Sequence, residues 1–234
     1  MEKIKIQIIK IGMQRHNAIF KRLENYNSNI FQVSFKQVPR PDCDLGWGFR
    51  FKTLNSILNN SFDKETNDLC IGFIDTQIER NYFSKRLSNY DIYVVSFFEI
   101  DKFLECNNID IFNFLLLTIY RSTSRFKAKG LPVAHDETKG CLFDMCGMKE
   151  DIIYSSSTPI ICKECHSLLL QHCDSQFLND IILELSKVRK SIYYRIKDFI
   201  ELHPWLSLTI GIVLSITLNI LSNFIFEIIK FYYS

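Results

Sequence analysis

A dense group of cysteine and histidine residues is the part of this sequence best suited to chemistry. Between His135 and Cys173 lie five of the eight cysteines and three of the five histidines. The members with metal-ligand spacing are His135, Cys141, Cys146, Cys162 and Cys165. Thiolate sulfur and imidazole nitrogen are the usual ligands of a tetrahedral Zn²⁺ ion.

The spacing within this group predicts a structural zinc knuckle over residues 135–165. Two sulfurs separated by two residues can reach one ion from a single turn, and the loop before Cys162 can supply the rest. We expect Cys141, Cys162 and Cys165 as ligands, with either Cys146 or His135 as the fourth. A closed site of four ligands stabilises a fold and leaves no position for a reactive water. Cysteines that only fill the core, or a redox CxxC, are the alternatives.

The start of the chain indicates a reducing compartment. Residues 1–11 alternate lysine with isoleucine, whereas a secretory signal has an unbroken apolar stretch and a small-residue cleavage site. We therefore expect a cytosolic domain, where clustered cysteines bind metal more often than they form disulfides. The formal net charge of +2 does not suit a strongly basic nucleic-acid binder, so we expect no direct nucleic-acid binding unless basic groups gather locally.

Strand-like and helix-like segments precede the cysteine group and must position it. Residues 3–11, 30–38, 69–74 and 90–98 have the pattern of strands, and residues 16–24 and 110–120 that of helices. The runs at 69–74 and 90–98 are largely apolar, which is typical of central strands covered on both faces. Asp110 stands where it can cap the helix that follows. We predict one α/β or α+β domain over residues 1–173.

A long amphipathic segment, residues 174–203, comes next. Its apolar residues recur at steps of three and four: Leu178, Ile181, Leu185, Val188, Ile192, Ile196 and Phe199. This periodicity predicts a juxtamembrane helix. Its apolar stripe can pack on the domain, pair with another copy or lie on anionic lipid.

Residues 204–226 carry no charged side chain and, as a helix, are long enough to cross a hydrocarbon core about 30 Å thick. Five basic residues lie between positions 187 and 197, whereas the tail at 227–234 has only Lys230 as a basic residue. The positive-inside rule then predicts a single-pass protein of the cell inner membrane with its N-terminal domain in the cytosol. An apolar helix buried in a soluble core is the alternative.

Small or polar residues occupy every fourth position on one face of this apolar segment. They are Ser207, Gly211, Ser215, Asn219 and Asn223. Small side chains at this spacing let two helices approach closely, and the two amides can hydrogen-bond across the contact. We expect a homo-oligomer, with ordinary tolerance of small residues in membrane helices as the alternative.

The order of the cysteine motif resembles that of the archaemetzincins, a family of zinc peptidases. Their C-terminal half has a ligand histidine, C-x4-C, a methionine and a distal CxxC. Here His135, Cys141 with Cys146, Met148 and the pair at 162–165 follow in that order. Upstream, the apolar runs at 71–75 and 93–96 also look like the central strands of that family, so the resemblance extends over about residues 69–170.

The chain departs from this family in its catalytic motif. The family uses HExxH for two zinc ligands and a general base, and HExxH is absent from this sequence. The helix expected to carry it reads FNFLLLTIYRSTSR, and five residues separate His135 from Cys141, where the family has the two residues adjacent. The resemblance therefore implies a scaffold without the peptidase activity, and we find no other catalytic set.

Together these features favour a non-enzymatic membrane effector or signalling subunit. Its zinc-stabilised cytosolic domain would receive a signal from a ligand or protein and pass it to a self-associating membrane helix. In a prokaryote this architecture is similar to that of membrane-disrupting effectors of antiviral defence systems. A divergent membrane-bound metallohydrolase and a simple membrane tether are the alternatives. The expected partners are the lipid bilayer, further copies of the chain and a cytosolic protein.

Overall fold

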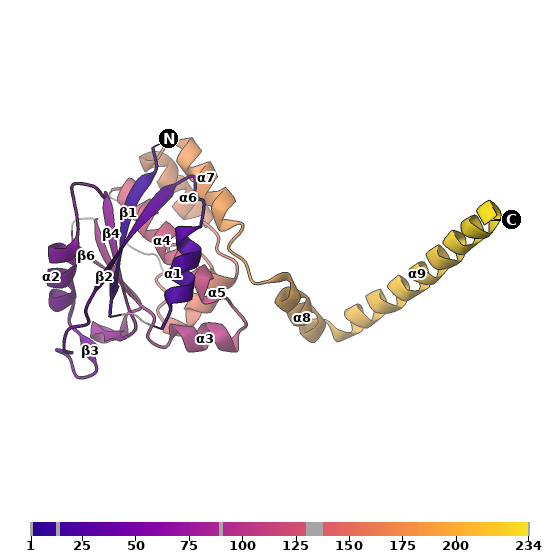
Figure 1. Ribbon diagram of the computed structural model, residues 1–234, viewed down its shortest axis with the longest axis horizontal. Helices are drawn as coiled ribbons and strands as arrows, with labels where there is room; N and C mark the ends of the chain where they lie inside the picture. The colour runs from indigo at the N-terminus through magenta and orange to yellow at the C-terminus, as the bar shows by residue number, and fades with distance from the viewer. Residues whose placement is uncertain (1, 13–14, 89–90, 130–137, 234) are drawn as a thin grey trace. The chain divides into compact units, whose positions relative to one another are not determined.

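A mixed sheet of five strands organises the first unit of the chain, Met1–Lys190 (Figure 1). The computed structural model describes residues 2–12, 15–88, 91–129 and 138–233. The strand order is β2 (Phe31–Val38), β1 (Ile4–Ile11), β4 (Leu69–Ile74), β7 (Ile92–Ser96) and β6 (Ser84–Ser88). The first four are parallel, and the edge strand β6 is antiparallel to β7. Parallel neighbours need crossover connections, which places helices on both faces.

Alternate side chains of the strands enter two cores, one on each face of the sheet. On β1, Ile6 and Ile8 belong to the larger core, whereas Ile9 and Ile11 belong to the smaller. The larger core packs against α1 (Asn17–Glu24), α3 (Ile100–Cys106), α4 (Ile111–Lys127), α5 (Ile152–Ser157), α6 (Lys163–His172) and α7 (Ser175–Leu185), and the smaller against α2 (Phe51–Ser61). All residues of β4 and β7 are buried, which explains their continuous apolar runs.

Short elements complete the first unit. Strands β3 (Gly48–Phe49) and β5 (Gln77–Ile78) pair in parallel, and η1 (Glu79–Asn81) and η2 (Lys149–Asp151) are single 3₁₀ turns. The first unit is therefore a mixed α/β domain, in agreement with the sequence prediction.

Helix α4 is buried along almost its whole length. Its N-terminus is capped as predicted, because the Asp110 carboxylate accepts a hydrogen bond from the Phe112 N–H at 2.9 Å. Every residue from Phe112 to Arg125 is buried, polar ones included. Buried polar groups need partners or a ligand, so the polar end of α4 becomes important for the site.

The structure divides the single helix predicted over residues 174–203. Helix α7 ends at Leu185, and α8 (Ile192–Leu202) begins after a non-helical stretch. At the break the Lys190 N–H donates to the Ser157 carbonyl, at the end of α5, at 3.1 Å, whereas in a continuing helix it would donate to the carbonyl four residues earlier. Leu185 and Val188 both belong to the larger core. The first half of the apolar stripe thus packs on its own domain, whereas Ile192 and Ile196 on α8 are exposed.

The buried carboxylate of Glu184 connects α7 to the rest of the domain through hydrogen bonds. Glu184, which is 2% exposed, accepts hydrogen bonds from the hydroxyls of Ser28 at 2.7 Å and Tyr120 at 2.6 Å, and from the Asn29 N–H at 2.6 Å. Burial raises the pKa of Tyr120, so its hydroxyl keeps the proton that it donates.

Removing this carboxylate should destabilise the first unit. Glu184→Ala leaves two buried hydroxyls and the part-buried Asn29 N–H without this acceptor. We expect the free energy of unfolding to fall by about 3 kcal/mol, which lowers the melting midpoint by about 6–12 °C. Thermal denaturation followed by circular dichroism measures the effect. Glu24→Ala, at an exposed position on α1, is the control, and equal midpoints for the two variants would contradict the role of Glu184.

The second unit, Ser191–Ser234, contains α8 and α9 (Pro204–Tyr233). Over Pro204–Phe226, α9 is long and apolar enough to cross a membrane, and it has no buried residue there in the described structure. It carries all five residues predicted for helix association. Within the helix, the Ser215 hydroxyl donates to the Gly211 carbonyl at 2.9 Å, and the Asn223 amide donates to Asn219 Oδ1 at 3.3 Å.

Candidate metal centre and basic pocket

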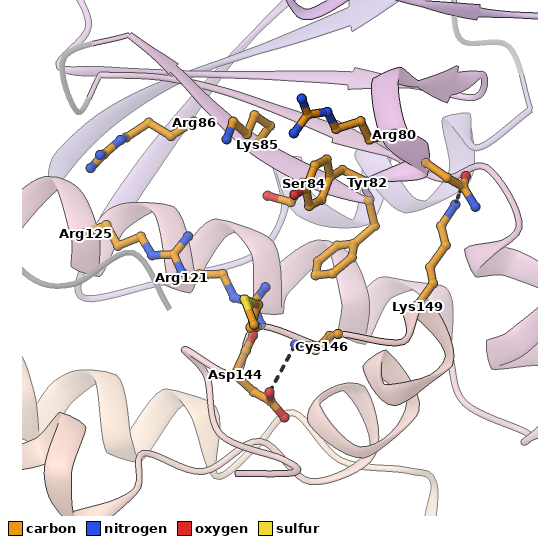
Figure 2. Close-up of a pocket in the computed structure, with 14 residues that line it drawn as sticks. Arg80, Tyr82, Ser84, Lys85, Arg86, Arg121, Arg125, Asp144, Cys146 and Lys149 are labelled. Carbon is orange, nitrogen blue, oxygen red and sulfur yellow. Dashed lines mark hydrogen bonds between the residues drawn. The ribbon is translucent and has the colours of Figure 1, made fainter. Parts of the chain in front are cut away.

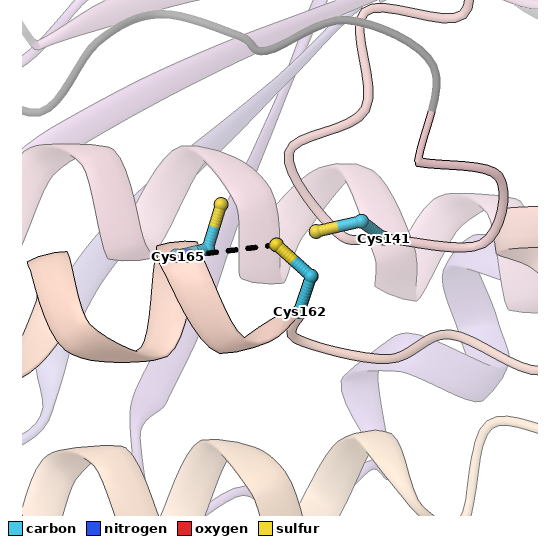
Figure 3. Close-up of side chains that lie close together, drawn as sticks. All are labelled: Cys141, Cys162 and Cys165. Atoms are coloured by element: carbon cyan, nitrogen blue, oxygen red, sulfur yellow. Dashed lines mark hydrogen bonds between the residues drawn. The ribbon is translucent and has the colours of Figure 1, made fainter.

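Three cysteine sulfurs converge at the start of α6 (Figure 3). The Sγ atoms of Cys141, Cys162 and Cys165 lie within 4.8 Å of one another. Thiolates bound at ~2.3 Å to a tetrahedral zinc ion are separated by about 3.8 Å, so this cluster could bind a zinc ion. The structure thus brings together the three cysteines that the sequence analysis proposed as ligands.

The CxxC pair is positioned by the first turn of α6. Cys162 is the N-cap, and its sulfur accepts from the Cys165 N–H at 3.5 Å. The positive end of the helix dipole favours thiolate at this position. A hydrogen bond with the Cys141 thiol, and then burial, raise the pKa of Cys165 in the metal-free cluster. A bound cation would supply the positive charge that three clustered thiolates require.

Cys141 reaches the cluster through a short backbone pairing. The Leu142 N–H donates to the Ile160 carbonyl at 2.7 Å, and the Ile160 N–H donates to the Gly140 carbonyl at 2.9 Å. Gly140 has a φ of +89°, a conformation that favours glycine. This turn sets Cys141 beside Ile160, two residues before Cys162, which is why cysteines 21 positions apart meet.

The fourth zinc ligand was predicted to be either Cys146 or His135, and the structure describes only the first of these residues. Cys146 is not part of the three-sulfur group; it lies in the wall of a separate pocket, and its N–H donates to Asp144 Oδ1 at 3.0 Å. The loop at 141–146 therefore turns its second cysteine away from the first. His135 lies outside the described residues, so its role as fourth ligand stays a prediction.

The pocket that includes Cys146 was not anticipated from the sequence (Figure 2). It has a volume of about 660 Å³ and lies between the β6 segment and α4. Six of its lining residues are basic, namely Arg80, Lys85, Arg86, Arg121, Arg125 and Lys149, and Asp144 is its acidic lining residue. The sequence did contain a signal of this pocket: Arg121 and Arg125 are the charged residues of the buried stretch Phe112–Arg125, and positions i and i+4 share one face of a helix.

Comparison with known protein families finds no match, and no curated protein sequence matches either. Among solved structures, the chain is similar to an archaemetzincin from Archaeoglobus fulgidus solved with malonate, at 18% identity and a TM-score of 0.46. It is also similar to a zinc-dependent peptidase from Methanocorpusculum labreanum, at 10% identity and a TM-score of 0.44. Each alignment covers 70% of this chain and 99% of the other. At these values the likeness decides neither family membership nor activity.

Proposed function

We propose that this chain is a non-enzymatic membrane effector or signalling subunit, anchored in the cell inner membrane by α9 with its first unit in the cytosol. The observation that carries the proposal is the exposure of α9. No residue of the apolar stretch Pro204–Phe226 is buried in the described structure. Water is a poor solvent for so much apolar surface, whereas a bilayer core matches both its length and its composition.

The flanking helix α8 supports this assignment. It exposes Ile192, Ile196 and Phe199 and carries Arg195 and Lys197. Its two basic residues are balanced by Asp198 and Glu201, so its exposed apolar face, and not net charge, suits it to lie at the surface of a bilayer. Basic residues before the span also favour the cytosol for the first unit.

Signal transmission would work by assembly. Association of the cytosolic units would raise the local concentration of α9 until its small-residue stripe pairs. Asn219 and Asn223 would then line a water-filled pore between the helices, and the bilayer would become permeable. Membrane disruption of this kind would suit an effector of a prokaryotic antiviral defence system.

Gly211→Ile tests this mechanism. A side chain at Gly211 meets nothing within 4 Å in the described structure, so the variant should fold and insert normally. We expect it to abolish oligomers in crosslinking experiments and dye release from liposomes, because a bulky residue keeps the helices apart. Val213→Ile, on the opposite face of α9, is the matched control. Full leakage by Gly211→Ile would rule out the mechanism.

The tether alternative makes a different prediction about the same helix. A tether needs only an anchor, so replacing Pro204–Phe226 with an unrelated polyleucine span would preserve its activity. An effector that acts through the stripe would insert and yet lose leakage after the same replacement.

A further inference from the structure

Positive charge is concentrated in the pocket between the β6 segment and α4. Figure 2 shows basic side chains of the strand segment on one side and those of α4 on the other. The charge of Lys149 is compensated in part, because its Nζ lies 3.4 Å from Glu99 Oε2. The pocket carboxylate, Asp144, accepts a backbone hydrogen bond from Cys146. For a chain with a formal net charge of +2, this is a strong local excess of positive charge.

Two of these cations are buried guanidinium groups on one face of α4. Arg121 is 4% exposed and Arg125 is 8% exposed. Arg121 donates to two neutral acceptors, the carbonyls of Leu142 at 2.6 Å and Asp144 at 3.2 Å. The structure records no ion pair for either arginine within the part of the chain that it describes.

Arg125 has a buried donor without an acceptor. Its Nε atom is buried and has no hydrogen-bond partner among the residues that the structure describes, and its guanidinium lies 6.0 Å from the centre of the Phe143 ring. Burial, and then the like charge of Arg121, lower the pKa of Arg125 to about 9. An unpaired buried charge destabilises a protein unless a ligand compensates it. An anion that enters the pocket would therefore compensate the charge of the Arg125 guanidinium.

The arginines, the volume and the aromatic lining of the pocket indicate which class of anion it can bind. A planar guanidinium group can donate two parallel hydrogen bonds to two oxygens of one phosphate. A volume of about 660 Å³ lies within the range of ~300–1,000 Å³ typical of small-molecule sites. Tyr82, 43% exposed, and Phe83 also line the pocket, and aromatic rings are platforms on which nucleobases stack.

We infer that this pocket binds a nucleotide-sized ligand carrying two or more phosphate groups. The ligand's phosphates would pair with Arg121 and Arg125, and its base would lie against Tyr82. That the pocket binds such a ligand does not depend on the proposed function. Only the role of the ligand as the signal received by the first unit rests on it.

Equilibrium dialysis on the full chain in detergent micelles tests the inference. The probes are ATP, cyclic di-AMP and inorganic pyrophosphate, with adenosine as the uncharged control. We expect at least one of the two nucleotides to bind more tightly than pyrophosphate, to raise the melting midpoint and to bind less tightly as salt increases. Adenosine should not bind. Absence of binding by all three phosphate probes would overturn the inference, and pyrophosphate binding as tightly as both nucleotides would overturn the base contact.

Two variants separate ligand binding from a structural role. Arg125→Gln should weaken nucleotide binding by about tenfold or more, and it should keep or raise the melting midpoint of the ligand-free protein because an unpaired buried charge is removed. Arg80→Glu, at an exposed position in the lining of the pocket, should weaken binding without affecting folding. Lys102→Gln, an exposed lysine that does not line the pocket, is the matched control.

Unchanged affinity in both Arg125→Gln and Arg80→Glu would refute the site. A lower ligand-free midpoint with unchanged binding would assign Arg125 to structure alone. Dialysis depends on neither membrane insertion nor leakage, so an absence of nucleotide binding would leave the proposed role of α9 unaffected. In the same way, the leakage result for Gly211→Ile would say nothing about the pocket.

Discussion

Replacing Cys162 and Cys165 with serine is expected to release bound zinc and to destabilise the first unit severely. Both side chains belong to the three-sulfur cluster, and hydroxyls are poor substitutes for thiolates as zinc ligands. We expect the affinity for zinc to fall by more than about 100-fold. Loss of about 5 kcal/mol of ligation energy would lower the melting midpoint by roughly 10–20 °C.

Elemental analysis of the purified protein and thermal denaturation measure these two effects. Cys106→Ser is the matched control, since Cys106 is exposed and lies outside the cluster. A double variant that melts like the wild type, together with a zinc-free wild type, would show that the cysteines only fill space. A zinc ion that exchanges readily in the folded protein would instead support the metallohydrolase alternative.

The same measurements identify the fourth ligand. His135→Ala should lose zinc, whereas Cys146→Ala should keep it, because Cys146 lies in the wall of the basic pocket and not among the three sulfurs. The opposite result would mean that the loop at 141–146 rearranges when the metal binds.

The second large effect concerns the membrane. Lysine placed at both Ile212 and Leu218 should move the protein from the membrane fraction to the supernatant. Each lysine near the middle of a spanning helix costs about 2.5–3.5 kcal/mol of insertion free energy, and both positions lie within the apolar stretch of α9. Ultracentrifugation without detergent measures the distribution. The double alanine variant at the same positions should remain with the membrane, and a wild type found in the supernatant would refute the anchor.

The orientation can be read from cysteine labelling on the same preparations. All eight cysteines precede α9 in the sequence, and Cys106 on α3 is exposed. If the first unit is cytosolic, a membrane-impermeant maleimide should label intact cells only after they are permeabilised.

Several features of this protein could be predicted from the sequence because short-range patterns determine them. The strands at 69–74 and 92–96 appear as apolar runs, Asp110 precedes the helix that it caps, and α9 is continuous and uncharged over Pro204–Phe226. The CxxC pair could also be predicted as a pair of metal ligands, because a spacing of two residues places both sulfurs on one turn.

Other features depend on contacts between distant segments, and only the tertiary structure decided them. The helix predicted over 174–203 divides where the Lys190 N–H bonds to the Ser157 carbonyl of a distant helix. Cys146 separates from Cys141 because the loop between them turns. The basic pocket needs the strand segment at 80–86, the end of α4 and the loop at 144–149 to meet. Hydrophobic periodicity and ligand spacing are local properties of a chain, whereas the concentration of charge in a cavity arises only when the chain folds.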